Sequence, residues 1–255
     1  MLLQMPAGLA TAYKSAAQRA RVVSEGWGEE NLYCPNCPSP KLRRSSANTA
    51  AVDFTCPQCD APYQLKSQSK PFSARIIDAA YEAMRSAVLL DRTPNLLALH
   101  YDLARWEVRS LVLIPRFAFS LSCIERRKPL SAGARRHGWV GCNIVLTSIP
   151  LDARIPLITN GMPASAASVR RQYDRLRPLA KLRHDTRGWT LDVLNVVRSL
   201  GNDEFSLAEV YAHADALARL HPDNRHVHDK IRQQLQVLRD LALVEFLGRG
   251  VYRLR

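Results

Sequence analysis

The chain has 255 residues and is 47% hydrophobic, which is enough to bury one or two ordinary globular cores. Its net charge of +13 and isoelectric point near 9.9 favour a polyanionic partner, such as nucleic acid or an acidic membrane surface. No apolar run approaches the roughly 18 residues that span a bilayer, and the opening residues lack the basic leader of a secretory signal. We therefore expect a cytoplasmic protein without a membrane segment.

The first predicted elements are a helix and a hairpin. Small and long-chain residues recur with helical spacing over 11–24, so a helix is predicted there. Two short strands, 51–55 and 62–67, follow and are joined by a Cys-x-x-Cys turn. Side chains alternate along a strand, so Gln64 and Lys66 share a face of this hairpin.

A second helix is predicted from Phe72 onward, with Ser73 as its N-cap. Its apolar face consists of Ile76, Ile77, Ala80 and Met84. Short apolar runs without helical period come next and are predicted as strands over 95–101, 108–114, 141–146 and 154–158. Helix, hairpin, helix and further strands indicate an α/β or α+β domain around a mixed sheet.

The composition changes after Ala164, where small and basic residues and Pro178 predict a connecting helix and a domain boundary near 182. The charge changes as well, because residues 1–182 carry 25 Lys and Arg against 13 Asp and Glu, whereas residues 183–255 carry 11 against 10. We expect the first domain to supply most of the attraction for a polyanion.

The last 73 residues, 183–255, have the pattern of an α+β winged helix-turn-helix. One helix is predicted over 189–200 with Thr190 as its cap, and a second over 206–220. The second begins with a capping box, Ser206-x-x-Glu209. A third helix over 226–242 and a hairpin over 243–255 complete the pattern. The buried face of the third helix is made of Ile231, Leu235 and Leu238, and the turn of the hairpin is Gly248-Arg249-Gly250.

Six cysteines in an unsecreted chain indicate metal ligands or buried thiols before disulfides. Two Cys-x-x-Cys pairs, 18 residues apart, match the spacing of a closed structural zinc site. Its ligands are Cys34, Cys37, Cys56 and Cys59. The alternative is two unrelated thiol sites or a redox pair. Cys123 and Cys142 have no partner at ligand spacing and are predicted to be buried small hydrophobes.

An acid, an amide and an ammonium flank the second cysteine pair. Asp53 lies on one strand of the hairpin, and Gln64 and Lys66 lie on the other. Such a set can serve phosphodiester hydrolysis, because hard oxygens bind Mg²⁺ and the lysine orients water and offsets charge. A neutral Gln64 adds no charge, so we expect weaker metal binding than with a carboxylate. Taken alone, the pattern is weak and favours a solvated strand edge, but the basic composition and the cysteine site shift the balance toward an active site.

The chain resembles the DpnI family of methyl-directed restriction endonucleases over nearly its full length. The segments that carry the resemblance are AYKSAAQRARV (12–22), YCPNC (33–37), VDFTCPQC (52–59), QLKS (64–67), and the stretches 127–144, 187–195 and 229–253. The resemblance implies a PD-(D/E)XK nuclease domain with a zinc site, over 1–182, and a winged-helix domain over 183–255. Each domain would recognise double-stranded DNA with a methylated adenine in GATC.

The resemblance also implies residue roles. Asp53, Gln64 and the carbonyl of Leu65 would hold Mg²⁺, and Lys66 would position water. The family pattern has Glu where this chain has Gln64, which bears on metal affinity and turnover.

Two segments are predicted to contact DNA. The first is a glycine-punctuated basic loop that contains Arg126, Arg127, Lys128, Arg135, Arg136 and Trp139. Its tryptophan offers a flat surface for the N-methyl group, although it could instead anchor the core with the arginines as a solvated face. The second is the winged domain, through Asn224, Arg225, His226, His228, Lys230 and Arg232 at the third helix, and Arg249 and Arg253 in the wing.

The leading hypothesis is a monomeric, Mg²⁺-dependent endonuclease that cuts GATC containing 6-methyladenine. The second is a methyl-adenine DNA-binding protein or regulator in which Gln64 has weakened or abolished turnover. The third is a zinc-ribbon transcription factor, in which loss of the Lys66 ammonium would change no activity.

Overall fold

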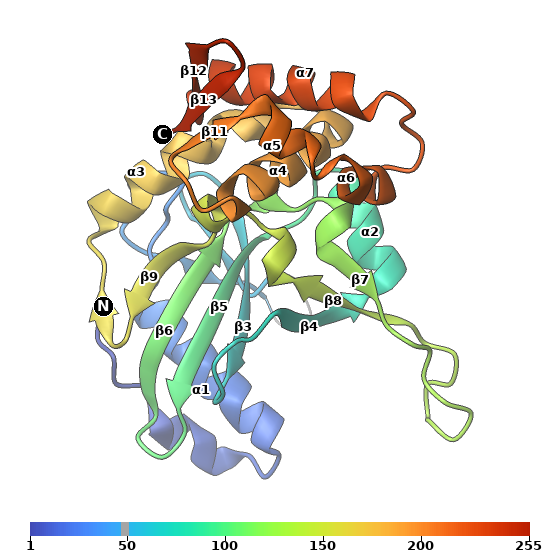
Figure 1. Cartoon of the computed structure of the whole chain (residues 1–255). Coiled ribbons are helices and arrows are strands. Elements are labelled where there is room, and N and C mark those ends of the chain that lie inside the picture. The colour runs from blue at the N-terminus through green and yellow to red at the C-terminus, as the bar shows by residue number, and fades with distance from the viewer. Residues whose placement is uncertain (47–50) are drawn as a thin grey trace. The chain divides into compact units, whose positions relative to one another are not determined.

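The structure, a computed structural model, describes residues 1–46 and 51–255, and the chain divides into two compact units (Figure 1). Unit 1 comprises residues 1–74, 92–116 and 152–176, and unit 2 comprises residues 75–91, 117–151 and 177–255. The predicted domains, 1–182 and 183–255, follow a different division, and that division stays a prediction.

Unit 1 is built on a seven-stranded mixed sheet. In spatial order the strands are β1 (Arg43–Arg44), β2 (Phe54–Thr55), β3 (Pro62–Gln68), β5 (Asn95–Asp102), β6 (Glu107–Ile114), β9 (Ile155–Thr159) and β10 (Met162–Pro163). The pair β3 and β5 is parallel, and every other neighbouring pair is antiparallel. The predicted mixed sheet and its strands over 95–101, 108–114 and 154–158 are confirmed.

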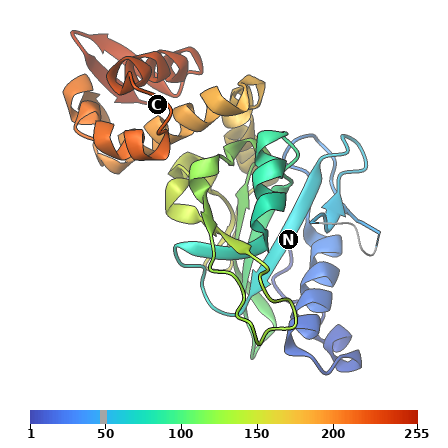
Figure 2. The same cartoon turned by 90° about the vertical axis from the view of Figure 1, so that its right-hand side faces the viewer.

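Helix α1 (Ala16–Asn31) follows a 3-10 helix, η1 (Ala7–Ala12), and runs beside β3 (Figure 2). The helix predicted over 11–24 therefore exists, but it begins and ends later. The buried side chains Val23 and Trp27 fix its position against the sheet. Gly28 allows the close approach, because a Cβ there would lie 2.6 Å from the Phe54 ring on β2. Helix α3 (Ala166–Leu176) packs against β9.

The helix predicted from Phe72, with Ser73 as its N-cap, is wrong in its first half. Residues Arg75–Ala80 form strand β4, and the helix, α2, covers only Tyr81–Leu89. Burial alternates along β4, since Ile76 and Asp78 are buried while Ile77 is 63% exposed. The two isoleucines therefore point to opposite faces, as the period of a strand requires.

Strand β4 belongs to a small sheet in unit 2. It pairs with β8 (Gly141–Val145), which also pairs with β7 (Ile124–Arg126), and helix α2 packs on these strands. Cys123 and Cys142 are fully buried here, as predicted. Short 3-10 turns occur at η2 (Arg116–Ala118), η3 (Leu121–Cys123), η4 (Leu146–Ser148), η5 (Leu151–Ala153) and η6 (Arg177–Lys181).

The end of the chain forms a helical subdomain with a three-stranded wing. Its elements are α4 (His184–Ser199), β11 (Glu204–Ser206), α5 (Leu207–Tyr211), α6 (Ala214–Leu220), α7 (Val227–Asp240), β12 (Val244–Gly248) and β13 (Val251–Leu254). The predicted hairpin and the buried face of α7 are confirmed, because β12 pairs with β13 and Ile231, Leu235 and Leu238 are fully buried. The single helix predicted over 206–220 is instead two short helices.

Thr190 is not a cap, contrary to prediction. It lies inside α4, which begins at His184, and its hydroxyl is 2.7 Å from both the Thr186 carbonyl and the side-chain amide of Gln234 on α7. A mid-helix threonine can satisfy its hydroxyl on the preceding turn. Thr190 therefore makes a buried polar contact between α4 and α7 and does not mark the start of a helix.

Among the described residues, no helix combines the length and the apolar character that a bilayer crossing requires.

The capping box of α5 gives a test of the winged subdomain. The Glu209 amide donates to the Ser206 hydroxyl at 3.3 Å, and the Ser206 amide donates to the Glu209 carboxylate at 2.7 Å. Ser206→Ala should lower the free energy of unfolding by about 1 kcal/mol in a urea titration. Ser131→Ala, at an exposed serine outside the helices, should change it by less than about 0.5 kcal/mol. Equal stability of the two variants would contradict a stabilising cap.

Candidate functional site

The four predicted zinc ligands converge at one end of the hairpin formed by β2 and β3. Their sulfur atoms all lie within 4.8 Å of one another, with Cys34 and Cys59 at 3.7 Å and Cys37 and Cys56 at 3.5 Å. A tetrahedral zinc with Zn–S bonds near 2.3 Å needs sulfur atoms about 3.8 Å apart. The arrangement therefore fits one zinc ion and leaves no position open for a catalytic water.

Neighbouring groups orient these thiols. The Tyr63 hydroxyl lies 3.1 Å from the Cys34 sulfur, and the Asn36 amide donates to the Cys59 sulfur at 3.4 Å. Burial acts to raise the pKa of Cys56, but the backbone amides of Gln58 and Cys59 lower that pKa to about 6. Burial raises the pKa of Cys34 and Cys37. A thiolate is the form that binds metal, so these two thiols would release their protons when a metal binds.

Arg170 connects the cysteine cluster to helix α3. Its guanidinium donates to the carbonyls of Cys34 and Ser39, each at 3.1 Å, and it lies 5.3 Å from the centre of the Tyr33 ring. These carbonyls belong to the first cysteine loop. The sulfur cluster therefore holds this loop at one side, and Arg170 of helix α3 holds it at the other.

The structure brings Asp53, Gln64 and Lys66 together, as predicted. Phe54 on β2 pairs with Tyr63, and Asp53, just before β2, donates its amide to the Tyr63 carbonyl at 2.8 Å, so Asp53 lies beside the start of β3. Gln64 and Lys66 are two residues apart on β3 and share a face.

A backbone hydrogen bond holds the Asp53 carboxylate. The Leu65 amide donates to its Oδ2 at 2.6 Å. Burial raises the pKa of Asp53, and the nearby charge of Glu25 raises that pKa further. The Leu65 amide and the charges of Lys66 and Arg21 act in the opposite direction, but the pKa stays above its usual value. Because the ionised form of this carboxyl is disfavoured, a bound cation would stabilise it.

Glu25 is a residue of this site that sequence reasoning missed. It lies on α1, is only 7% exposed, and its carboxylate accepts hydrogen bonds from Arg21 and Arg44. The helix was predicted to end at residue 24, and a Glu four residues after an Arg is typical of a solvated helix face. A buried carboxylate could be anticipated only if the face of the helix were known.

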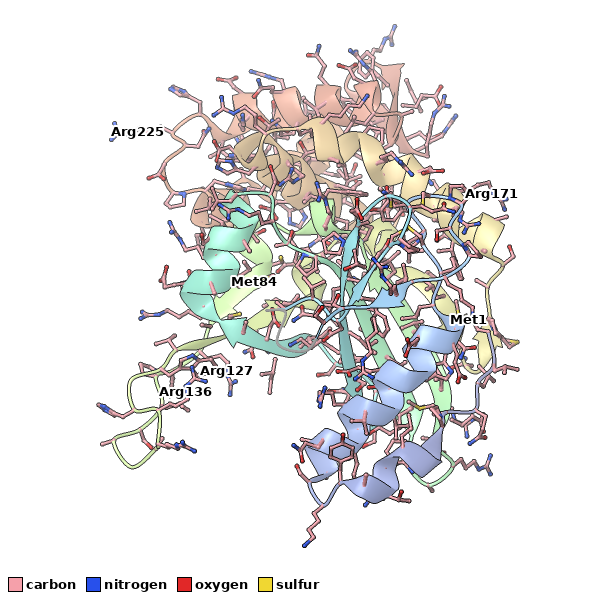
Figure 3. All side chains as sticks on the ribbon, turned by 180° about the vertical axis from the view of Figure 1, so that it is seen from behind. Met1, Met84, Arg127, Arg136, Arg171 and Arg225 are labelled. Carbon is pink, nitrogen blue, oxygen red and sulfur yellow. The ribbon has the colours of Figure 1, made fainter. Side chains whose placement is uncertain are left out.

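The predicted basic loop forms an arm between β7 and β8. Leu130 and Trp139 close it through backbone hydrogen bonds, one of which joins the Leu130 amide to the Trp139 carbonyl at 2.9 Å. Arg127 and Arg136 both lie on this arm (Figure 3). The predicted basic residues are all exposed, namely Arg126, Arg127, Lys128, Arg135 and Arg136.

Trp139 is half-buried and does not belong to the core, so the alternative in which it anchors the core is not supported. Its ring covers Gly141, where a Cβ would lie 2.8 Å away, and the Arg136 guanidinium lies 4.9 Å from the ring centre. The arm thus presents a tryptophan with a cation on it, which is a surface suited to a nucleobase or a phosphate.

The predicted residues of the winged subdomain gather where α7 begins. A hollow of about 530 Å³ is lined by Arg225, His226, His228 and Arg232, together with Tyr211, whose ring stacks on His228 at 4.3 Å. Lys230 bonds Gln233 on the same helix, and Asn224 accepts from the His226 amide. Arg249 is exposed in the wing turn with a positive φ of 50°.

Arg253 pairs with Glu204 at 2.6 Å across the wing, and its predicted contact with the DNA backbone stays a prediction. Its guanidinium is therefore used within the subdomain.

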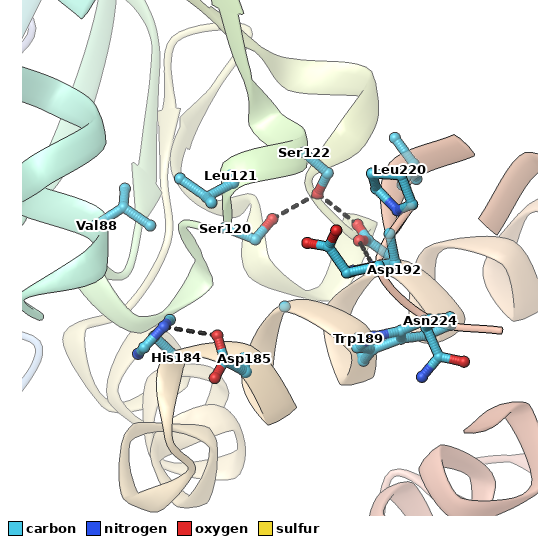
Figure 4. A pocket seen from close by; sticks show the side chains of 14 residues that line it. Val88, Ser120, Leu121, Ser122, His184, Asp185, Trp189, Asp192, Leu220 and Asn224 are labelled. Atoms are coloured by element: carbon cyan, nitrogen blue, oxygen red, sulfur yellow. Dashed lines mark hydrogen bonds and ion pairs between the residues drawn. The ribbon is translucent and has the colours of Figure 1, made fainter. Parts of the chain in front are cut away.

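A pocket of unit 2, about 600 Å³, has one predicted contact residue, Asn224, among its lining residues (Figure 4). Its polar groups satisfy one another, because Asp192 accepts from the Ser122 hydroxyl at 2.6 Å and lies 2.8 Å from the His221 ring nitrogen. The His221 ring also stacks on Trp189 at 3.9 Å. We interpret this network as part of the packing of α4.

Comparison with protein-family models gives two matches. Residues 1–182 match DpnI, described as the Dam-replacing family, and residues 185–254 match DpnI_C, described as the Dam-replacing HTH domain. Together they cover almost the whole chain.

The cysteine cluster predicts one zinc ion per chain. Cys59→Ala should release the zinc and lower the melting temperature, because three thiolates leave the tetrahedron open and the hairpin unpinned. Metal analysis of the purified protein and a thermal melt check this. Cys123→Ala, at a buried thiol outside the cluster, should keep its zinc. Full zinc content in the Cys59 variant would contradict the assignment.

The raised pKa of Asp53 predicts a pH-dependent penalty on folding. Ionising this carboxyl costs more in the folded chain than in the unfolded chain, so the penalty is absent below the unfolded pKa of about 3.9 and grows as the pH rises through the folded value. In magnesium-free buffer, Asp53→Asn should therefore be at least as stable as the unchanged protein at pH 7, and should lose any advantage near pH 4. A lower melting temperature of the variant at pH 7 would contradict this.

Proposed function

We propose, from the premise that the chain belongs to the DpnI or Dam-replacing family, that it is an Mg²⁺-dependent endonuclease for GATC containing 6-methyladenine. Family membership supports the coarser statement, a methyl-dependent restriction enzyme that acts on DNA. The finer statement rests on the site. The observation that carries it is the convergence of Asp53, Gln64 and Lys66 at the start of β3.

The donor atoms of this site suit a hard divalent cation. Asp53 offers a carboxylate, Gln64 an amide oxygen and Leu65 a backbone carbonyl, and oxygen is the ligand that Mg²⁺ prefers. The raised pKa of Asp53 supports the fit, because a bound cation would relieve the cost of its charge. When bound, Mg²⁺ would polarise the scissile phosphate and offset its charge.

The residues of the chain divide the remaining tasks. The Leu65 amide donates to Oδ2 of Asp53, which would leave the other carboxylate oxygen to hold a cation. Lys66, on the same face as Gln64, would orient the attacking water and offset charge on the phosphate. The side-chain amide of Gln64 would orient the bound cation through its dipole, but it supplies no negative charge. In this proposal the site belongs to a PD-(D/E)XK nuclease domain over 1–182.

Sequence recognition is assigned to two surfaces. The arm offers exposed arginines for phosphates and guanine edges, and Trp139 for the N-methyl group. The start of α7 offers Arg225, His226 and His228 to base edges, as the recognition helix of a winged domain over 183–255 would. We propose that the protein acts as a monomer.

A second function is favoured by one observation, the neutral Gln64 in the metal site. If the loss of one negative charge weakens Mg²⁺ binding enough, the chain is a methyl-adenine DNA-binding protein that does not turn over.

A plasmid digest separates these functions. With Mg²⁺, the protein should cleave a plasmid with 6-methyladenine in GATC and leave the unmethylated plasmid intact. Lys66→Ala should slow cleavage by at least about 100-fold, since a group that acts directly on the reacting water should matter more than an outer-shell partner. Lys70→Ala, at an exposed lysine just beyond the strand, should cleave at the normal rate.

If neither plasmid is cut and Gln64→Glu is also inactive, the nuclease assignment fails. Selective gel shifts with methylated DNA would then establish the binding protein.

A further inference from the structure

The loop between α6 and α7 carries Arg225 and His226, two residues that we propose to present to DNA base edges. The loop covers residues 221–226, and none of these six residues belongs to a helix or a strand. Regular secondary structure therefore does not set the direction of their side chains. Another set of contacts must hold the loop if the two residues are to meet DNA in a fixed arrangement.

Hydrogen bonds connect the loop residues one after another. The Asn224 amide donates to the His221 carbonyl at 3.1 Å, and the His226 amide donates to Oδ1 of Asn224 at 2.8 Å. His226 is also the N-cap residue of α7. The backbone is thus fixed step by step from His221 to the start of the helix.

The side chain of His221 is held on two sides. Its Nε2 lies 2.8 Å from Oδ2 of Asp192, and its ring stacks on Trp189 with 3.9 Å between the ring centres. Both partners lie on α4 and are buried, since Asp192 is 4% exposed and Trp189 is 6% exposed. An ionised carboxylate can only accept hydrogen bonds, so Nε2 of His221 is the donor.

Asp192 is in turn fixed from its other side. The Ser122 hydroxyl donates to Oδ1 at 2.6 Å and lies 2.6 Å from the Ser120 hydroxyl, as Figure 4 shows. Each oxygen of this carboxylate therefore has a donor, as a buried charge requires. The carboxylate could not turn away from His221 without leaving a buried oxygen unpaired.

The surroundings of His221 do not suit a DNA phosphate. The pocket beside it is lined by the carboxylates of Asp185, Asp192 and Asp223, and none of its described lining residues is Lys or Arg. Carboxylates repel a phosphate. Any effect of His221 on DNA binding must therefore pass through the loop.

We propose that His221 is a positioning residue for DNA recognition, and this proposal rests on the proposed function. It ties the loop to α4 through Asp192 and Trp189, and thereby sets where the loop residues meet base edges. His221 itself does not contact DNA.

Steady-state cleavage of a methylated duplex by the full chain tests the proposal. His221→Ala should raise KM about 10-fold, because a hydrogen bond to a charged group no longer holds the loop. The value of kcat should stay within about 2-fold, since the residues at the reacting phosphate are unchanged. A merely structural role would instead lower kcat, in proportion to the protein that fails to fold, at an unchanged KM.

Two further variants keep the proposal testable if His221→Ala does not fold. His221→Gln keeps an N–H for Asp192 without the ring, and His221→Phe keeps a ring on Trp189 without the hydrogen bond, so each should raise KM less than His221→Ala. The matched control is His184→Ala. His184 lines the same pocket but pairs with Asp185 on its own helix at 2.6 Å, so KM should not change.

A double-mutant cycle shows whether His221 acts through the loop. Independent substitutions multiply their effects on KM, whereas substitutions in one hydrogen-bonded network do not. Asn224→Ala removes the acceptor of the His226 amide, so adding His221→Ala to it should raise KM by less than about 3-fold further. A full 10-fold further rise would overturn the proposal.

Hydrogen exchange measures the loop without DNA. In His221→Ala, the amides of Asn224 and His226 should exchange about 10-fold faster, while amides of 231–238 in the buried part of α7 keep their protection. Unchanged exchange of the two loop amides would overturn the proposal, as would a lowered kcat with an unchanged KM. If the unchanged protein cuts no DNA, the proposed function fails, whereas the exchange rates still decide whether His221 holds the loop.

Discussion

The register of the β2 and β3 hairpin is the constraint on which the site depends. The four sulfur atoms lie at its closed end, and the pairing of Phe54 with Tyr63 sets the register of the two strands. A slip by one residue would turn the carboxylate of Asp53 to the other face. The hydrogen bond from the Leu65 amide to that carboxylate exists only in the observed register. The cysteine cluster therefore positions the chemistry without taking part in it.

The site is assembled from charges that oppose each other. Burial and the neighbouring Glu25 raise the pKa of Asp53, whereas Lys66 and Arg21 lower it. Carboxylates and cationic side chains therefore act on each other at this hairpin. Gln64 is neutral and adds no negative charge to this set.

The two surfaces that we propose to contact DNA differ in construction. The arm between β7 and β8 carries exposed arginines and a half-buried Trp139, so it combines attraction for phosphate with an apolar plane. The start of α7 carries histidines and arginines among acidic neighbours, and Arg253 is neutralised by Glu204. The uneven charge of the sequence fits this difference, because residues 1–182 carry most of the net positive charge.

The sequence by itself determined the features that depend on local spacing. The cysteine pairs, the strand period that places Gln64 and Lys66 on one face, the capping box at Ser206 and the wing hairpin all follow from neighbours a few residues apart. Only the tertiary structure decided the features that depend on a partner far along the chain. Residues 75–80 pair with β8 as a strand, Thr190 lies inside a helix and contacts Gln234 on α7, and Glu25 lies beside β3 because α1 packs on that strand. Local helix or strand propensity cannot specify such contacts, because each depends on which face of one element packs against another element.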